Sequence, residues 1–157
     1  MPGLIQISEA ASIGLHACLW LAAQKGRLCR GAEICRRFGF STAHSAKVMQ
    51  ALARAGLVES VRGPRGGTRL ARDPGAITLL EVYENLNGPA APGRCLLAPR
   101  FCAARCCPLG RELDRANRGL RDTLAKTTLL SLSAATDWSG IAKHKKNPVN
   151  PERGEEG

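Results

Sequence analysis

The stretch that decides the fold is GAEICRRFGFSTAHSAKVMQALARAGLVESVRGPRGGTRLAR, residues 31–72. Ser41 is a natural N-cap, because its side-chain oxygen can accept the backbone N–H groups left free at the start of a helix. Behind it, Val48, Leu52 and Ala55 recur at helical spacing and form one apolar stripe. Gly56 can then end the helix as a C-cap. This segment therefore predicts an amphipathic helix that begins just after Ser41.

A short helix is expected before this one, over residues 32–38, and a basic hairpin after it. The side chains expected on the short helix are Ile34, facing inward, and Arg30, Arg36 and Arg37, facing outward. Residues 57–61 and 68–71 are typical of two strands, joined by a turn rich in Gly and Pro over residues 62–67. Two helices, a tight turn and a hairpin make a winged helix-turn-helix. We therefore predict a mainly α fold with a small β-hairpin wing.

The flanking sequence adds helices. Ser8 can cap a first helix that runs to about residue 25, and a short helix is expected over residues 78–86. From Pro108 onward, apolar residues recur at steps of three and four along a charged helix. This apolar seam consists of Leu109, Leu113, Ala116, Leu120 and Leu124. We expect the same helix of a second subunit to cover this seam, because a small domain has few other apolar surfaces that could cover it. The alternative is that the seam packs on the chain's own domain.

These elements divide the chain into four expected segments: a winged helix-turn-helix DNA-binding domain over 1–88, a cysteine-rich sensor loop over 89–107, a long dimerisation helix over 108–135 and a disordered tail over 136–157.

Composition points to a polyanionic partner. The chain has 157 residues, a formal charge of +10 and a pI near 9.8, which favour nucleic acid or an anionic surface. Aromatic residues make up only 4%, so base stacking on an aromatic platform is not expected. We see no apolar run long enough to span a bilayer and no signal peptide, and we expect a bacterial cytoplasmic protein associated with the nucleoid. In a reducing compartment its seven cysteines are metal ligands or buried thiols rather than a disulfide framework.

The expected partner is double-stranded DNA. Residues at the start of the second helix are predicted to face base edges or phosphates, and arginines of the hairpin to contact the backbone or the minor groove. The predicted contacts are Thr42, Ala43, His44, Ser45 and Lys47 from the helix, and Arg62, Arg65 and Arg69 from the hairpin. The alternative is that some of these arginines form only a solvated surface.

Four cysteines fall within residues 95–107. Thiolates are the ligands of iron–sulfur clusters, and a loop rich in Pro and Gly can bring several of them together. A helix that starts at Pro108 would direct its positive end at Cys106 and Cys107, which favours thiolate. Zinc and a cluster-free thiol patch are the other interpretations, and zinc is the weaker because the paired C-x-x-C spacing of structural zinc sites is missing. Cys18, Cys29 and Cys35 are simplest as small buried hydrophobes.

The sequence resembles the Rrf2 family of bacterial transcription regulators. The similarity lies in LARAGLVESVRGPRGG at residues 52–67, in residues 70–72 and Pro74, in ITL at 77–79, in residues 82–88 and in the start IQIS at 5–8. It covers roughly residues 5–133. The family includes iron–sulfur, nitric-oxide and cysteine-metabolism regulators. The resemblance implies dimeric, sequence-specific binding of DNA near promoters.

The resemblance also implies a cofactor and its ligands. In many members three cysteines in the loop before the dimer helix hold an iron–sulfur cluster, of the 2Fe–2S or 4Fe–4S type, and here Cys95, Cys102 and Cys107 match them. A further ligand would come from the first helix of the partner subunit. For that ligand His16 ranks first, then Glu9, then the extra thiol Cys106.

Together these observations predict a dimeric repressor that senses redox state, nitric oxide or iron–sulfur status through a cysteine-ligated cluster. The first alternative is a cluster-free DNA-binding regulator controlled by thiol oxidation or by a protein partner, and a distant one is a redox or electron-transfer protein. No enzyme activity and no small-molecule substrate are expected, because the sequence shows neither a nucleophile–base pair nor the Lys-Ser/Thr that a P-loop needs after a Gly-rich turn.

Overall fold

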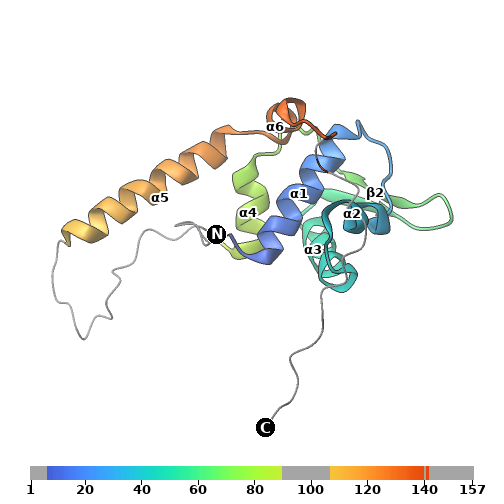
Figure 1. Cartoon of the computed structure of the whole chain (residues 1–157), viewed down its shortest axis with the longest axis horizontal. Coiled ribbons are helices and arrows are strands. Elements are labelled where there is room, and N and C mark those ends of the chain that lie inside the picture. Colours follow the sequence, from blue (N-terminus) through green and yellow to red (C-terminus); the bar gives the residue numbers. More distant parts are fainter. Residues whose placement is uncertain (1–6, 90–106, 140, 142–157) are drawn as a thin grey trace, which may run out of the picture.

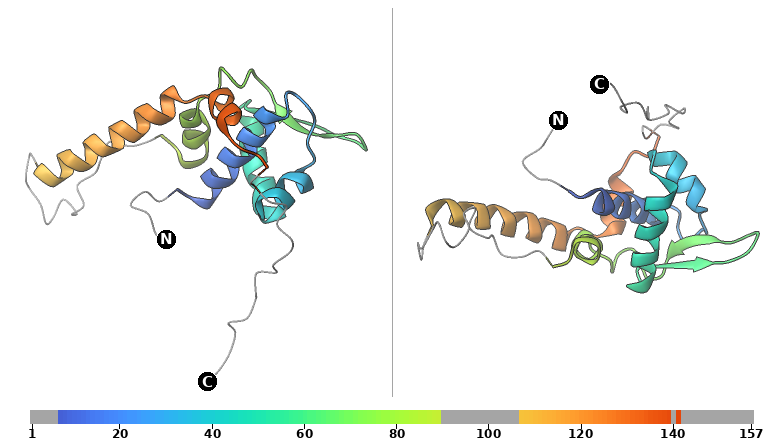
Figure 2. Two further views of the ribbon diagram at one scale, coloured as in Figure 1. Left: turned by 45° about the horizontal axis from the view of Figure 1, so that its top comes forward. Right: turned by 90° about the horizontal axis from the view of Figure 1, so that it is seen from below.

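The structure, a computed structural model, describes residues 7–89, 107–139 and 141. In chain order its elements are α1 (Glu9–Ala23), α2 (Gly31–Phe38), α3 (Thr42–Arg54), β1 (Val58–Val61), β2 (Gly67–Leu70), α4 (Leu79–Asn87), α5 (Pro108–Lys126) and α6 (Leu129–Ala135). The fold is mainly helical with one two-stranded antiparallel hairpin, as the sequence predicts. The wing and α5 project from opposite sides of the helical domain (Figures 1 and 2).

Helix α1 lies at the centre of the domain and contacts α3, α4, α6 and β2. Its N-cap Ser8 accepts a hydrogen bond from the backbone N–H of Ala11, so the helix begins where the sequence predicts. Ile13 and Ala17 are fully buried, and the helix is apolar on several sides, as expected of a helix surrounded by others. Leu52 of α3 and Ile77, just before α4, complete the core around it.

Two left-handed glycines shape the helix-turn-helix. Gly39 has φ 71° and ends α2, and Gly56 has φ 69° just after α3. Between them Ser41 caps α3, with its side chain accepting from the backbone N–H of His44. Glycine adopts positive φ without the steric cost that a Cβ brings, so these two positions fix the lengths of α2 and α3.

The wing is tied to the domain through Cys29. Val58 pairs with Leu70 and Glu59 with Arg69 in the β1–β2 register. On its other side Thr68 exchanges two backbone hydrogen bonds with Cys29, of 2.9 and 2.8 Å. A Cβ at Gly67 would lie 2.8 Å from the carbonyl oxygen of Cys29, so this close approach requires glycine. The wing is thereby held next to the N-terminus of α2.

The segment predicted as one helix over residues 108–135 is two helices. Thr127 and Thr128 adopt extended backbone, α5 ends at Lys126, and Thr128 opens α6 with a capping box. The reason is backbone pairing: Leu79 N–H donates to the Thr127 carbonyl over 3.0 Å, and Leu129 N–H donates to the Ile77 carbonyl over 2.9 Å. Residues 127–135 therefore return to the DNA-binding domain, where Leu129 is fully buried.

The structure also corrects the outward position predicted for Arg37 and the start of the tail at residue 136. The Arg37 guanidinium lies 4.0 Å from the ring centroid of Trp20, a cation–π contact, and donates a hydrogen bond to the Trp138 carbonyl. The Trp138 ring packs edge-on against Trp20 at 5.4 Å. Residues 136–139 thus belong to the fold. The remainder of the predicted tail, like residues 90–106 of the predicted loop, lies outside the described residues.

Helix α5 contributes no buried residue. Leu109 is 58% exposed and Leu113 36%, and only near its C-terminal end does Leu124 pack on the core. Arg121 reaches Glu84 of α4 across 3.4 Å. In all views the N-terminal end of α5 is the end far from α1 (Figures 1 and 2). Of the helices that the structure describes, none combines the length and hydropathy that crossing a membrane requires.

We predict that Leu129→Ala lowers the free energy of unfolding by about 2–5 kcal/mol, because it opens a cavity in the core. Leu130→Ala is the matched control: Leu130 is 50% exposed, so its loss should change stability by no more than about 0.5 kcal/mol. Urea unfolding followed by tryptophan fluorescence measures both. Equal effects would contradict the placement of Leu129 in the core.

Candidate nucleic-acid interface and metal centre

The first turns of α3 form an exposed surface beside the wing. Thr42, Ala43 and Lys47 are exposed, as predicted for residues that face bases or phosphates. Ala46 and Gln50 lie on the same face, three and seven residues after Ala43, and are exposed as well. Ala46 and Gln50 are thus further candidates for contacts with DNA, which helical periodicity adds to Ala43 and Lys47.

Ser45 does not belong to this surface. It is 5% exposed, and its hydroxyl is buried with no hydrogen-bond partner among the described atoms. The cause is helical spacing, since Ser45 lies three and seven residues before Val48 and Leu52 and shares their inward face. His44 lies at the edge of the surface, where its Nδ1 is 3.3 Å from Glu9 Oε1. The prediction that Ser45 faces DNA is therefore wrong.

The wing arginines fall into two groups. Arg62 and Arg65 are exposed, and within the described chain no carboxylate pairs with either of them. Arg69 instead binds Glu59, its cross-strand neighbour, with 2.5 Å between Nε and Oε1. The hydrogen-bonding capacity of Arg69 is thus partly used inside the hairpin. Arg62 and Arg65 are the more available of the predicted wing contacts.

A further basic surface, not predicted from the sequence, lies between α2 and the wing turn. A shallow polar hollow there is lined by Arg27, Arg30, Arg36, Arg65 and Glu33. Arg30 donates to the Pro64 carbonyl over 3.1 Å, which joins α2 to the wing turn. Glu33 pairs with Arg27 at 2.6 Å, and this hydrogen bond lowers the pKa of the Glu33 carboxyl. The hollow extends the positive surface from the wing to the start of α2.

Three cysteines in the helical domain are buried free thiols, as predicted: Cys18, Cys29 and Cys35. Burial raises the pKa of Cys18 to about 12, so this sulfur stays a thiol. Burial also raises the pKa of Cys29. Neither of these two sulfurs has the thiolate character of a metal ligand.

Only part of the predicted metal centre lies in the described chain. Cys107 is the N-cap of α5, and its Sγ accepts the backbone N–H of Gly110 at 3.4 Å. Cys95, Cys102 and Cys106 lie outside the described residues, and among the described ones no group of three His, Cys, Asp or Glu side chains could hold a metal.

The two candidate ligands on α1 differ in their surroundings. His16 is exposed, and its Nδ1 lies 2.7 Å from the Ser12 carbonyl oxygen. Because a carbonyl only accepts, Nδ1 is the donor in this contact, and in the neutral imidazole the lone pair for a metal is then on Nε2. Glu9 is already paired with His44. His16 therefore has an available donor atom, whereas Glu9 would have to leave its partner.

These features define a class: a winged helix-turn-helix DNA-binding transcriptional regulator, with an exposed recognition helix flanked by a basic wing. The profile of the Rrf2 family, described as iron-dependent transcriptional regulators, matches residues 7–135, and the chain belongs to this family. The family consists of transcriptional regulators and not of enzymes, as the sequence predicts.

Individual relatives agree with this assignment. The HTH-type transcriptional regulator BadM of Rhodopseudomonas palustris is 42% identical over 78 residues, half of this chain and half of its own. Among solved structures, CymR, the global cysteine regulator of B. subtilis, has a TM-score of 0.73 and 30% identity, over 85% of this chain and all of that one. IscR of T. potens shares the fold, with a TM-score of 0.65 and 24% identity over 85% of this chain and 90% of its own.

We predict that Arg62→Ala makes the dependence of DNA affinity on salt shallower by about 0.9 in the slope of log K against log salt, because one phosphate contact is lost. Arg72→Ala is the matched control, since Arg72 is paired with Glu81. Fluorescence anisotropy on a duplex that the protein selects from genomic fragments measures both slopes. The same slope for Arg62→Ala and the unaltered protein would remove Arg62 from the interface.

Proposed function

We propose that this chain is a homodimeric repressor whose DNA affinity is set by an iron–sulfur cluster on Cys95, Cys102 and Cys107, in response to redox state, nitric oxide or iron–sulfur status. The observation that carries the proposal is the position of Cys107. It caps α5 at the end far from the DNA-binding domain, next to the exposed leucines of the same helix. A sensing group there would lie beside the proposed dimer contact.

The dimer proposal is supported by the α5 seam. Leu109, Leu113 and Ala116 are exposed on a helix that buries nothing against its own domain along most of its length. Apolar residues at steps of three and four favour burial against another helix. A second copy of α5 supplies the same seam in a self-complementary contact. Two copies of α3 would then meet two half-sites about one helical turn apart on the duplex.

The described part of the donor set fits a cluster. The Cys107 sulfur lies at a helix N-terminus and accepts the backbone N–H of Gly110, so the positive end of the helix dipole would face the negative charge of a bound cluster. Bound there, an iron–sulfur cluster would supply one-electron chemistry and sensitivity to oxidants and nitric oxide. The protein's part is to hold the thiolates and to link their position to α5.

For the remaining ligand we propose His16 of the partner subunit. The support is its exposed imidazole with Nδ1 bonded to the Ser12 carbonyl, an arrangement that orients many metal-binding histidines. Within one chain α1 and the start of α5 lie far apart (Figure 1), which is why a second subunit is invoked. Glu9 ranks second because it is paired with His44.

A cluster-free regulator is the second candidate. It is favoured by the 30% identity and TM-score of 0.73 to CymR, which is named for cysteine regulation. It would keep the same DNA-binding surface and sense through thiols or through a partner protein.

We predict that Leu113→Glu converts the protein to monomers and weakens operator binding at least tenfold, because a charge in the seam opposes the helix contact and one half-site is lost. Glu112→Ala, at the adjacent exposed position, is the control and should leave the protein a dimer in solution. Sedimentation equilibrium and anisotropy report the two properties. A Leu113→Glu dimer with unchanged affinity would exclude α5 as the interface.

We predict that protein purified without oxygen is coloured and contains iron, and that Cys107→Ser loses both properties. Cys35→Ala keeps them, because Cys35 is a buried residue of α2 and is not among the proposed ligands. His16→Ala should change the visible spectrum and speed bleaching in air, whereas Glu9→Ala should not. Visible absorbance and an iron assay measure these properties. Colourless, iron-free wild-type protein would contradict the cluster proposal and support the cluster-free regulator.

A further inference from the structure

Ala43 and Gln50 form the outermost line of α3. Successive residues of an α-helix are turned by about 100° around its axis, so both lie about half a turn from Leu52, which is fully buried on the inward face. Both are exposed, and they lie about two helical turns apart, one above the other. When a recognition helix enters the major groove, the side chains opposite its buried face are the ones directed at the base edges.

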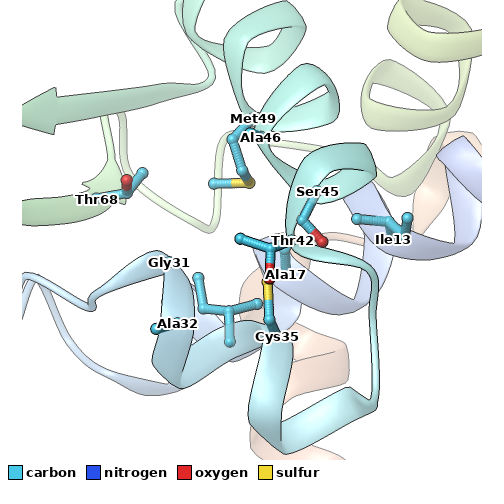
Figure 3. A pocket seen from close by; sticks show the side chains of 11 residues that line it. Ile13, Ala17, Gly31, Ala32, Cys35, Thr42, Ser45, Ala46, Met49 and Thr68 are labelled. Atoms are coloured by element: carbon cyan, nitrogen blue, oxygen red, sulfur yellow. The ribbon is translucent and has the colours of Figure 1, made fainter. Parts of the chain in front are cut away.

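The positions on either side of this outermost line have other surroundings. Thr42, Ala46 and Met49 border a mostly apolar cavity between α3, α2 and the wing (Figure 3), so that side of α3 faces the rest of the domain. The outermost line does not border this cavity. Lys47 lies on the opposite side of the line, and its long, flexible ammonium side chain suits a backbone phosphate. Direct reading of bases therefore depends chiefly on the outermost line.

The carboxamide of Gln50 is complementary to one base edge. It carries a hydrogen-bond donor and an acceptor side by side. In the major groove only adenine presents an acceptor, N7, next to a donor, N6, whereas guanine presents two acceptors, cytosine a donor, and thymine an acceptor and a methyl group. Among the described residues no hydrogen bond engages the Gln50 amide. Helix α3 also has no carboxylate that could accept a hydrogen bond from cytosine.

We propose that Gln50 reads an adenine in each half-site through N7 and N6, and that the methyl group of Ala43 packs on the methyl group of a thymine at another base pair. Ala43 offers no side-chain hydrogen bond, and thymine is the base with an apolar group in the major groove. The small side chain of Ala43 also lets α3 approach the bases closely. Two helical turns, about 10 Å, keep the two contacts on different base pairs. The proposal takes its two half-sites from the proposed dimer and does not depend on the cluster.

The first test is the selection of binding sites from a random duplex library by the full chain. The wild-type protein should prefer adenine at one position of each half-site by about 5- to 150-fold, the range for one good bidentate contact. Gln50→Ala should lose this preference and keep the rest of the motif. Gln24→Ala is the control, because Gln24 caps α1 and its amide oxygen binds Arg27. This variant should select the wild-type motif.

Modified bases in the selected duplex test the individual contacts by fluorescence anisotropy. At the position that depends on Gln50, 7-deazaadenine lacks N7 and should weaken wild-type binding about 2- to 10-fold, the range for one hydrogen bond. It should not affect binding by Gln50→Ala. Uracil lacks the methyl group of thymine and should weaken wild-type binding about fourfold at one position. Ala43→Gly should bind thymine and uracil duplexes equally at that position. Circular dichroism checks that each variant is folded.

The proposal would be overturned by either of two results for Gln50. One is the same motif, with the same strength, from the wild-type protein and Gln50→Ala. The other is a preference for a base other than adenine at the position that depends on Gln50. A uracil effect that persists in Ala43→Gly would overturn the Ala43 contact. A motif with one adenine position in place of two would support the readout and contradict the proposed dimer.

Discussion

The backbone pairing between residues 77–79 and 127–129 is the constraint on which the rest of the architecture depends. Two hydrogen bonds, Leu79 to Thr127 and Leu129 to Ile77, join the chain before α4 to the chain after α5. The side chains of Ile77 and Leu129 next to them are fully buried. This pairing closes the helical domain and fixes the point from which α5 extends. Without it, the apolar pattern would permit α5 to continue through α6 as one helix with no fixed relation to the core.

The C-terminal end of α5 is anchored to the helical domain, and its N-terminal end projects away from it. Cys107 caps one end, and the other end contacts α4, which in turn contacts α3. The Arg121–Glu84 ion pair adds a contact between α5 and α4. These contacts form a contiguous route from α5 to α3, and under the proposed function a change in the position of the Cys107 end would be passed along it. In the proposed dimer this route would set the separation of the two α3 helices.

Local signals explain which elements were predictable. Ser8, Ser41 and Thr78 each cap a helix, and the glycines after α2 and α3 occupy positive φ. These signals act within a few residues, so the sequence alone is enough to find them. The break after Lys126 was missed because the leucine spacing continues across it, and what interrupts the helix is pairing with residues distant in the chain. Trp138 was missed for the same reason, since its contact with Trp20 is tertiary.

Only those features of the site that follow from helix periodicity or from the hairpin register could be predicted from the sequence. The Glu59–Arg69 pair follows directly from the register, because opposite charges on facing strand positions attract. The inward direction of Ser45 follows from its spacing to Val48 and Leu52. The Arg37–Trp20 contact does not follow from either rule, and neither does the hollow between α2 and the wing. The surroundings of Arg37 and of the arginines that line this hollow therefore could not be predicted from the sequence.

This difference in availability bears on how the surface would recognise DNA. Arg69, Arg72 and Arg27 each hold a carboxylate, so a phosphate contact would require an existing ion pair to break or to be shared. Exposed ion pairs of this kind are weak, so a phosphate can replace the carboxylate. Breaking the ion pair nevertheless offsets part of the free energy gained from the phosphate contact. Arg62, Arg65 and Lys47 have no such competitor in the described chain. Within the described chain, the positive charge of this face that is free of ion pairs is therefore concentrated at the wing turn and the first turns of α3.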